Sequence, residues 1–577
     1  MGVAIPPFVK GRRRRPEPYH SRKRIVGTLA PDGKEGFLGT KEITKTLQPE
    51  EHPPSDMRRN ASLVATGILL SRIAGLVRER VFAYYFGISD AADAFRGAFR
   101  IPNFLQNLFG EGVLSASFIP VYANLLARGK DEEADRVASA VFCLLALVVS
   151  CLVLVGVLAT PFVTKILAWG YKGSKHELTS GLVRILFPGA GLLALSAWCL
   201  GILNSHRKFF ISYTAPIAWN LAMIASLIGF GSHFEQDSLT EVLAWGSVAG
   251  SALQVGVQLP QVVRLVGRFW VTLGLGMDSV KTVIRNFLPV FVSRGVVQIS
   301  AYIDTELATF LPTGALASLV NAQTLYTLPV SLFGMSVSAA ELPAFSSALG
   351  EADEVNAYLR NRLNAGLRQI AFFVIPSAMA FLALGDVIAG ALYQTGRFGR
   401  NESVYVWAIL AGSAIGLLAT TLGRLYASMY YSLKDTRTPL RYAIVRVCLT
   451  AGLGYLFAIP LPPFLGLNPR WGAVGLTASA GLCGWLELAL LRNSMKGRIG
   501  KTGLPAGFVL KLWVCAGVAA AAGWGGKLMM NQTHPIVLAI VSLGMYGIAY
   551  FGAAIVFRLP EVEDLVNKVT RFVGSLR

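Results

Sequence analysis

The sequence contains few charged residues for its length. Of 577 residues, 15% are Asp, Glu, Lys or Arg and 53% are hydrophobic, whereas a soluble chain carries about 25% charged residues. Apolar runs of eighteen or more residues recur along the chain, and runs of that length are typical of transmembrane helices. The composition therefore excludes a soluble globular protein and predicts a polytopic membrane protein.

Residue patterns of the common catalytic and metal-binding sites are also missing. None of the six cysteines forms a CxxC pair, and the six histidines lie in the expected tail and loops. Walker A, HExxH and GxSxG motifs are absent, and so are DxD-type carboxylate pairs. We therefore expect no enzyme, no cofactor and no metal site. The expected energy source is the membrane potential, an H⁺ or Na⁺ gradient, or downhill flow of the substrate.

The chain has no apolar segment of the kind found in a cleavable signal peptide before its first long run. Residues 1–59 are instead rich in Pro and Gly and contain the basic clusters Arg12–Arg15 and Arg22–Arg24. We interpret them as a disordered basic cytoplasmic tail able to contact anionic lipid. The net charge of +20 comes mostly from loops between the apolar runs, which indicates membrane orientation rather than nucleic-acid binding.

The hydrophobic pattern predicts an all-α protein with fourteen transmembrane helices. Loops that are rich in Lys and Arg alternate with loops that are poor in them, which places both termini in the cytoplasm. The predicted spans are 60–86, 91–127, 133–169, 177–204, 212–231, 239–265, 280–311, 314–349, 354–384, 402–431, 438–459, 470–492, 506–529 and 535–557.

The chain also repeats itself at a spacing of about 223 residues. Ser71-Arg72 in the first span resembles Ser293-Arg294 in the seventh, and Leu108–Gly110 in the second resembles Leu332–Gly334 in the eighth. We infer two six-helix lobes related by a pseudo-two-fold axis along the membrane normal, which is typical of transporters with a site between the lobes. The predicted domains are an N-lobe (60–265), a C-lobe (280–492), two further helices (506–557) and a cytoplasmic tail (558–577).

Charged side chains lie in the middle of the first two spans. Such charge is expensive in a membrane and indicates a functional site. At 100° per residue, one face of the second span is polar over about 25 Å; this face carries Asp93, Arg96, Arg100, Asn103, Asn107 and Glu111. The alternative is that this polar face is exposed to water and has no binding role.

Arg72 and Arg294 occupy equivalent positions in the two lobes, and the seventh span adds Gln298, Asp304 and Glu306. An arginine-rich cavity favours an anion, because guanidinium groups match phosphate oxygens bidentately. The length of the polar face suggests a large headgroup, and the last two helices would then form an apolar groove for a lipid tail. The alternative for Arg72 and Arg294 is that they only hold helices together. The alternative for the last two helices is that they only pack against the rest of the protein.

These residues resemble the MurJ (MviN) family of lipid II flippases in the MOP exporter superfamily. The resemblance implies fourteen helices and the transport of undecaprenyl-pyrophosphate-linked disaccharide-pentapeptide from the cytoplasmic to the periplasmic leaflet, for peptidoglycan synthesis. It covers about 60–557 and rests on these segments: Ser71–Glu79, Asp93–Phe95, Ile101–Asn103, Phe109–Gly112, Phe118–Pro120, Gln298–Ser300, Leu342-Pro343, Tyr393–Phe398 and Lys434–Pro439.

By the same resemblance, Arg72 and Arg78 match functional arginines, Asp93 a cavity acid, and Glu111 the acid of an F-x-E-G motif. Two positions depart: Gln106 and Thr324 stand where many members have arginine. We hypothesise that Arg294, with Arg96 or Arg100, supplies the displaced charge. The predicted substrate-binding residues are Arg72, Arg78, Asp93, Arg96, Arg100, Asn103, Glu111, Arg294 and Gln298.

The resemblance further implies alternating access in the bacterial inner membrane. The expected partners are lipid II, membrane lipids and cell-wall synthesis proteins, and no nucleic acid. The main alternative is a MOP-superfamily exporter of another lipid-linked oligosaccharide. A drug exporter would show more acids and aromatics in the cavity, a polyprenyl-phosphate transferase would need a base or metal carboxylates, and a scaffold would depend on its tail.

Overall fold

A computed structural model describes the chain over residues 55–109, 111–346, 352–530 and 534–562. The chain divides into Met1–Met57 and a large unit, Arg58–Arg577, which holds almost the whole helical bundle. Apart from one isolated bridge between Thr395 and Phe398, the described residues form helices, turns and loops. The predicted all-α fold is confirmed, while most of the two predicted tails lies outside the described residues.

Among the described residues, eleven helical segments are long and apolar enough to cross a bilayer. The shortest have 22 residues, or about 33 Å at 1.5 Å per residue. They are α6 (Asp131–Leu158), α8 (Gly173–Ser205), α9 (Phe209–Phe230), α10 (Gln236–Leu265), the run of α12 (Ala315–Pro329), η2 (Val330–Met335) and α13 (Ser336–Ser346), α14 (Ala352–Tyr393), α15 (Arg400–Ser432), α16 (Arg437–Ala458), α18 (Gly472–Ile499), α19 (Ala506–Met529) and α20 (Pro535–Val556).

The other three predicted spans coincide with more polar or broken helices, so the count of fourteen is compatible with the structure. These are α1 (Ser55–Phe86), α11 (Asp278–Thr309), and a broken second span made of α2 (Asp90–Ala98), α3 (Arg100–Phe109), α4 (Glu111–Ser117) and α5 (Ile119–Ala127). Pro102 and Pro120 stand in the first turns of α3 and α5, where a missing N–H is tolerated.

Shorter elements complete the chain. The third predicted span is divided into α6 and α7 (Thr160–Leu167), and α17 (Leu461–Phe464) and η3 (Pro469–Trp471) precede α18. Pro161 lies at the start of α7 and limits the hydrogen bonding that would continue α6.

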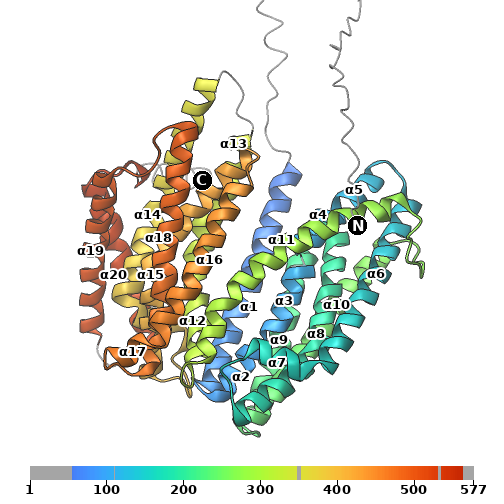
Figure 1. Cartoon of the computed structure of the whole chain (residues 1–577), viewed down its shortest axis with the longest axis horizontal. Helices are drawn as coiled ribbons and strands as arrows, with labels where there is room; N and C mark the ends of the chain where they lie inside the picture. The colour runs from blue at the N-terminus through green and yellow to red at the C-terminus, as the bar shows by residue number, and fades with distance from the viewer. Residues whose placement is uncertain (1–54, 110, 347–351, 531–533, 563–577) are drawn as a thin grey trace, which may run out of the picture. The chain divides into compact units, whose positions relative to one another are not determined.

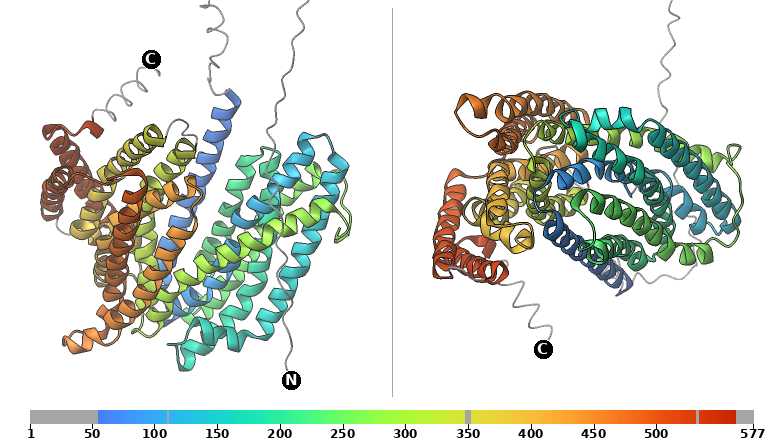
Figure 2. Two further views of the ribbon diagram at one scale, coloured as in Figure 1. Left: turned by 45° about the horizontal axis from the view of Figure 1, so that its top comes forward. Right: turned by 90° about the horizontal axis from the view of Figure 1, so that it is seen from below.

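Buried apolar side chains form two cores, one for each lobe. The first gathers residues mostly between Phe82 and Val283, and the second gathers residues mostly between Ala308 and Val562. We therefore describe α1–α10 as the N-lobe and α12–α18 as the C-lobe. Helices α19 and α20 pack against α14, on the side of the C-lobe away from the N-lobe (Figure 2).

Helix α11 links the lobes and crosses obliquely between them (Figure 1). The rings of Phe287 and Phe291, in its first half, contact Phe109 of α3 at a tilt, with ring centroids 6.2 and 5.4 Å away. Its later part packs against α12 and α16. The helix that we predicted as the first of the C-lobe thus rests partly on the N-lobe.

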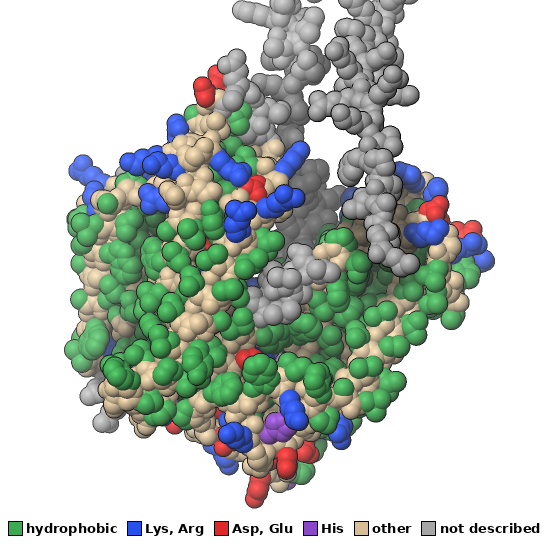
Figure 3. All heavy atoms as spheres, in the orientation of Figure 1, with side chains coloured by type: hydrophobic (Ala, Val, Ile, Leu, Met, Phe, Trp, Pro, Cys, Tyr) green, Lys and Arg blue, Asp and Glu red, His purple; other side chains and the backbone are tan. Residues whose placement is uncertain are grey.

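The surface of the large unit has an apolar middle. On the face shown in Figure 3, hydrophobic side chains cover most of the central part, while Lys and Arg gather toward the two ends. Large apolar side chains such as Ile540 (68% exposed) and Ile548 (78%) point outward from α20. Outward-facing apolar residues over the length of a bilayer are expected on a surface that contacts lipid tails.

The loop between α15 and α16 is held by Asp435. Its carboxylate accepts hydrogen bonds from the backbone N–H groups of Arg437 and Thr438, both at 3.0 Å, and from the Thr438 hydroxyl at 2.7 Å. Arg498 of α18 completes the set. The Thr438 hydroxyl and N–H, with Arg498, lower the pKa of Asp435 from 3.8 to about 2.

We expect the carboxylate of Asp435 to make a pH-dependent contribution to the stability of the protein. Because the pKa of Asp435 is lower in the folded than in the unfolded chain, its stabilisation is complete above about pH 4 and is lost as the pH falls toward 2. Thermal unfolding of the wild type and Asp435→Asn should therefore differ at pH 6 and converge near pH 2. A constant difference across this range would show that the charge of Asp435 is not what stabilises the loop.

Candidate functional site

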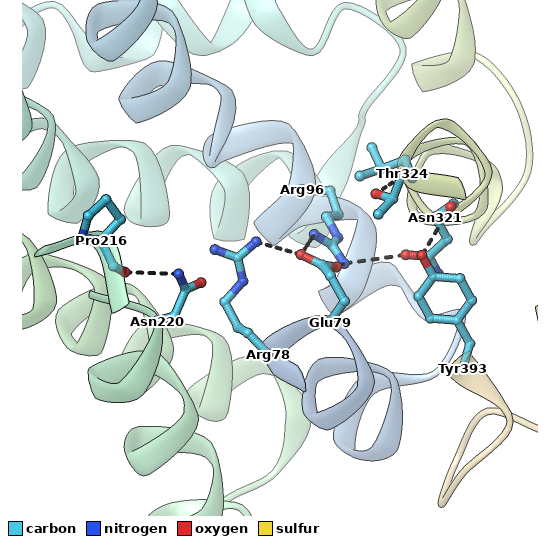
Figure 4. Close-up of polar contacts among 9 residues, drawn as sticks. Arg78, Glu79, Arg96, Pro216, Asn220, Asn321, Thr324 and Tyr393 are labelled. Carbon is cyan, nitrogen blue, oxygen red and sulfur yellow. Dashed lines mark hydrogen bonds and ion pairs between the residues drawn. The ribbon is translucent and has the colours of Figure 1, made fainter. Parts of the chain in front are cut away.

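Two arginines surround one buried glutamate where α1 meets α2 (Figure 4). Arg78 donates to Glu79 Oε1 at 2.6 Å, and Arg96 donates to both oxygens of the same carboxylate. The side chains of Glu79 and Arg96 are 6% and 7% exposed, whereas that of Arg78 is 16% exposed. One carboxylate neutralises one guanidinium, so the trio keeps a net positive charge and Arg78 is its most accessible member.

Aromatic rings hold both guanidinium groups in place. The Arg96 guanidinium lies 4.2 Å from the ring centroid of Phe82, and that of Arg78 lies 5.2 Å from Trp219 and 5.8 Å from Phe99. Cation–π contacts of this kind are most favourable where water is excluded. The rings therefore fix the orientation of the two guanidinium groups without neutralising their positive charge.

Arg96 extends this cluster into the other lobe. Its Nη2 donates to Asn321 Oδ1 of α12 at 3.3 Å, and the Tyr393 hydroxyl of α14 donates to the backbone oxygen of Asn321 at 3.0 Å. Thr324, one turn further along α12, donates its hydroxyl to Val320 O at 3.0 Å (Figure 4). Separating the lobes here would break the hydrogen bond between Arg96 and Asn321 and expose the buried guanidinium of Arg96.

Asp93 of α2 makes a second connection between the lobes. Its buried carboxylate accepts hydrogen bonds from the N–H groups of Gly314 at 2.7 Å and Ala317 at 2.8 Å, at the start of α12. Lys175 of α8 donates to the same carboxylate at 2.7 Å. An acidic group at a helix N-terminus satisfies free N–H groups and interacts favourably with the helix dipole. Asp93 therefore fixes α12 to the N-lobe.

Gly314 is required at this connection. Its φ of +82° is in the left-handed region, and a Cβ there would lie 1.6 Å from Cγ2 of Ile88. We expect Gly314→Ala to lower the free energy of unfolding by about 3 kcal/mol or more, from backbone strain plus overlap. Gly173→Ala is the control, because Gly173 has a φ of +58° but open space around it. Thermal unfolding of both variants tests this, and equal losses would contradict the proposed overlap.

Further backbone contacts join the lobes near the same place. Arg80 of α1 donates to the carbonyl oxygens of Ala391 at 2.7 Å and Leu392 at 3.1 Å, at the end of α14. The N–H of Arg397 donates to Tyr84 O at 3.0 Å. All of these contacts between α1–α10 and α12–α18 lie where α1 ends and α12 begins, which we call the closed end.

Arg100 of α3 faces the carboxylate of Glu306 on α11. Its Nη1 lies 3.6 Å from Glu306 Oε1, and its guanidinium lies 5.2 Å from the ring centroid of Tyr302. Among the described residues, both carboxylate oxygens of Glu306 and Oδ1 of Asp304 are buried without a hydrogen-bond partner. The charge of Arg100 is thus largely balanced within the protein.

The structure places the nine predicted site residues in three situations. Arg78, Asp93, Arg96 and Arg100 take part in polar contacts within the N-lobe or with its neighbours α11 and α12. Arg72 and Asn103 are exposed on α1 and α3. The side chains of Glu111, Arg294 and Gln298 lie outside the described residues, so the predicted role of Arg294 in replacing a displaced arginine remains a prediction.

Sequence reasoning missed three residues that the site depends on: Glu79, Lys175 and Asn321. Glu79 was visible as an acid in the middle of the first span, next to Arg78. Lys175 and Asn321 carried no local signal, because their partners are 82 and 225 residues away in the sequence.

A two-lobed helical bundle with an apolar surface and charged side chains between its lobes defines a polytopic membrane transporter. A family model described as "Lipid II flippase MurJ" matches residues 82–544. The probable lipid II flippase MurJ of Rhizobium tropici is 31% identical over 74% of this chain and 79% of its own. The lipid II flippase MurJ of Burkholderia cenocepacia is 31% identical over 76% of this chain and 84% of its own.

Solved structures show the same fold. A lipid II flippase MurJ in an inward closed conformation matches with a TM-score of 0.71 and 23% identity, covering 87% of this chain and 99% of that one. An inward-facing MATE family transporter of the MOP superfamily matches with a TM-score of 0.60 and 16% identity, covering 74% and 95%. The chain belongs to the lipid II flippase MurJ family, which is a family of transporters and not of enzymes.

Proposed function

We propose that this chain moves lipid II from the cytoplasmic to the outer leaflet of the bacterial inner membrane by alternating access. The observation that carries the proposal is the pair of arginines around Glu79, placed between the lobes in a member of this family. Lipid II joins a polyprenyl tail to its headgroup through a pyrophosphate, and a guanidinium fork matches phosphate oxygens in geometry and charge.

In this proposal Arg78 and Arg72 receive the pyrophosphate. Arg78 is the accessible member of the buried trio, and Arg72, six residues or about 9 Å nearer the start of α1, is exposed. Arg96 and Arg100 are engaged by Glu79 and Glu306, so they set the local potential rather than bind first. Arg294 is the further arginine that we propose for the C-lobe side.

The basic loops support an orientation with both termini in the cytoplasm. Helix α1 then ends at the outer side, so the closed end faces outward and the substrate enters from the cytoplasmic side. Release on the outer side requires the contacts of Asp93, Arg96 and Arg80 with the C-lobe to break. The polyprenyl tail stays in the lipid along the exposed apolar faces of α19 and α20.

We further propose that the membrane potential, or an H⁺ or Na⁺ gradient, supplies the energy. An inside-negative potential favours outward movement of an anionic headgroup by about 2.3 kcal/mol per charge and 100 mV. Cell-wall synthesis proteins are proposed as further partners.

Transport by the purified chain tests this function. Proteoliposomes containing fluorescent lipid II should show protein-dependent movement of the label between leaflets, measured by quenching the outer-leaflet fraction. A lipid-linked oligosaccharide without the peptide should move much more slowly. Equal or faster movement of that second lipid would favour another exporter of the same superfamily.

A further inference from the structure

Helices α19 and α20 reach the rest of the protein mainly through α14. In the part of the chain that the structure describes, they pack mostly against each other and against α14, on the side of the C-lobe away from the N-lobe (Figure 2). An effect of these two helices on the N-lobe must therefore pass along α14. Side chains of the neighbouring helices bind α14 at two places where its backbone departs from a regular helix.

The first of these places is Pro376. Proline has no N–H, so the carbonyl oxygen of Phe372, four residues earlier, lacks its usual partner within the helix. The hydroxyl of Tyr550, on α20, donates to this oxygen at 2.6 Å. The hydroxyl of Tyr546, one turn earlier on α20, donates to Pro376 O at 2.7 Å. Both tyrosines are buried, so α20 is fixed to α14 at this point.

The second place is a kink at Leu384, where φ is −126° and ψ is 17°, outside the helical region. Trp407 of α15 donates its ring N–H to the carbonyl oxygens of Phe381 at 3.0 Å and Leu382 at 3.1 Å, in the turn before the kink. Leu384 is buried against α19, and a Cβ on Gly523 would lie 2.6 Å from its Cδ1. Residues 385–393, which we call the end segment of α14, therefore form a separate piece of helix.

The end segment makes several of the C-lobe contacts of the closed end. Its carbonyl oxygens at Ala391 and Leu392 accept hydrogen bonds from Arg80 of the N-lobe. Its last residue, Tyr393, is fully buried and donates to the backbone oxygen of Asn321, whose side chain accepts from an N-lobe arginine. The stability of the closed end therefore depends on where the end segment lies.

An ion pair joins the end segment to α19. Lys527 donates to Asp386 Oδ2 at 2.6 Å, and the two side chains are 21% and 15% exposed. Asp386 is the second residue of the end segment, five residues or about 8 Å before Ala391. Lys527 lies two residues before the end of α19 at Met529, where a lysine on its flexible stem can extend to water. Its ammonium instead lies in a partly buried contact with one carboxylate.

We propose that Lys527 is a positioning residue for transport: by pairing with Asp386, it holds the end segment of α14 against the N-lobe and stabilises the closed end. This gives α19 a role besides contact with the lipid tail. The proposal rests on the proposed function, because alternating access requires the closed end to open. Without the ion pair, the end segment turns about the kink at Leu384, and its contacts with the N-lobe weaken.

Distances between the lobes of the full chain in nanodiscs test this role without any substrate. Spin labels at Lys172 and Asn401, two exposed positions on the N-lobe and the C-lobe, report on the closed end once the exposed cysteines are replaced. We expect Lys527→Met to raise the fraction of long distances about fivefold or more. Lys511→Met is the control: Lys511 is an exposed lysine near the other end of α19, and its loss should leave the distances unchanged.

A double variant separates positioning from stability. In Lys527→Met, the carboxylate of Asp386 stays partly buried without its partner, which destabilises the protein. Asp386→Asn/Lys527→Met removes both charges, so we expect its thermal unfolding to return close to that of the wild type while its fraction of long distances stays raised. Lipid II transport in proteoliposomes should be about threefold or more slower in both variants, because the closed form that takes up the lipid is less populated.

The outcomes separate this role from a purely structural one. Wild-type distances in Lys527→Met would contradict the proposal, and so would equal opening in Lys511→Met. If the distances of the double variant recover together with its thermal stability, the ion pair only stabilises the fold and the proposal is wrong. If the wild type does not move lipid II although Lys527→Met opens as expected, the proposed function is contradicted, whereas the link between α19 and the closed end is supported.

Discussion

Replacing Glu79 by alanine will lower the free energy of unfolding by about 3–5 kcal/mol, because it leaves two guanidinium groups in a buried site without their carboxylate. Arg78 and Arg96 both contact Glu79, so their mutual repulsion adds to the loss of hydrogen bonds. We expect lipid II transport to fall at least tenfold as well, since the position of Arg78 is no longer fixed. Thermal unfolding in detergent and transport in proteoliposomes measure the two effects.

Glu132→Ala is the matched control for Glu79→Ala. Glu132 forms an ion pair with Arg136 at 2.7 Å, but these side chains are 68% and 53% exposed. Exposed pairs one helical turn apart contribute about 0.3–0.5 kcal/mol. If Glu79→Ala were no more destabilising than Glu132→Ala, the buried trio would not be the structural centre of the site.

Asp93→Asn will open the closed end in a larger fraction of molecules. Asp93 accepts three hydrogen bonds, from Lys175, Gly314 and Ala317, and the neutral amide loses the charge attraction for Lys175 and one acceptor oxygen. Loss of about 1.4 kcal/mol or more shifts the equilibrium between closed and open forms tenfold or more. Asp90→Asn should have a smaller effect, because Asp90 contacts Lys175 at 2.8 Å but its side chain is 57% exposed.

Distance measurements between spin labels on the two lobes test this shift. Lys172 precedes α8 and Asn401 lies at the start of α15, and both are exposed. The exposed cysteines Cys151 and Cys448 must first be replaced. We expect a longer-distance population in Asp93→Asn, and little of it in the wild type or Asp90→Asn. An unchanged distribution in Asp93→Asn would show that this carboxylate does not hold the lobes together.

The positions of most helices could be predicted from hydrophobic runs and the loops that end them. The predicted spans 402–431 and 438–459 agree within two residues with α15 (Arg400–Ser432) and α16 (Arg437–Ala458). This works because the apolar thickness of a bilayer fixes the length of a spanning helix and charged residues mark its ends.

The interruptions within the second predicted span could not be predicted from the hydrophobic pattern. A helical wheel over 91–127 assumed one continuous helix, whereas regular helix is interrupted at Phe99, between α2 and α3, and at Phe118, between α4 and α5. The surroundings of the predicted polar face change along its length: Asp93 and Arg96 are buried, while Asn103 and Asn107 are exposed. Pro102 and Pro120 follow these two interruptions within three residues, and each lacks the N–H that an unbroken helix would use.

From the sequence, the site could be predicted only where a single charged residue stands in an apolar segment. Arg78 and Asp93 stood out because charge in an apolar segment requires an explanation. That Asp93 contacts the first N–H groups of α12, or that Arg96 reaches Asn321, depends on how two segments more than 200 residues apart pack together. Glu79 matters most among the missed residues, since its carboxylate decides which arginine is left to bind an anion.

The most direct test of the account is complementation. The resident lipid II flippase of a bacterium would be depleted, this chain expressed, and the lipid II accessible to an external probe measured. We predict that the wild type restores outside exposure of lipid II, that Arg78→Gln does not, and that the surface variant Arg136→Gln does. Failure of the inserted wild-type chain to restore exposure, or full activity of Arg78→Gln, would contradict the central claim that arginines between the lobes bind and move this lipid.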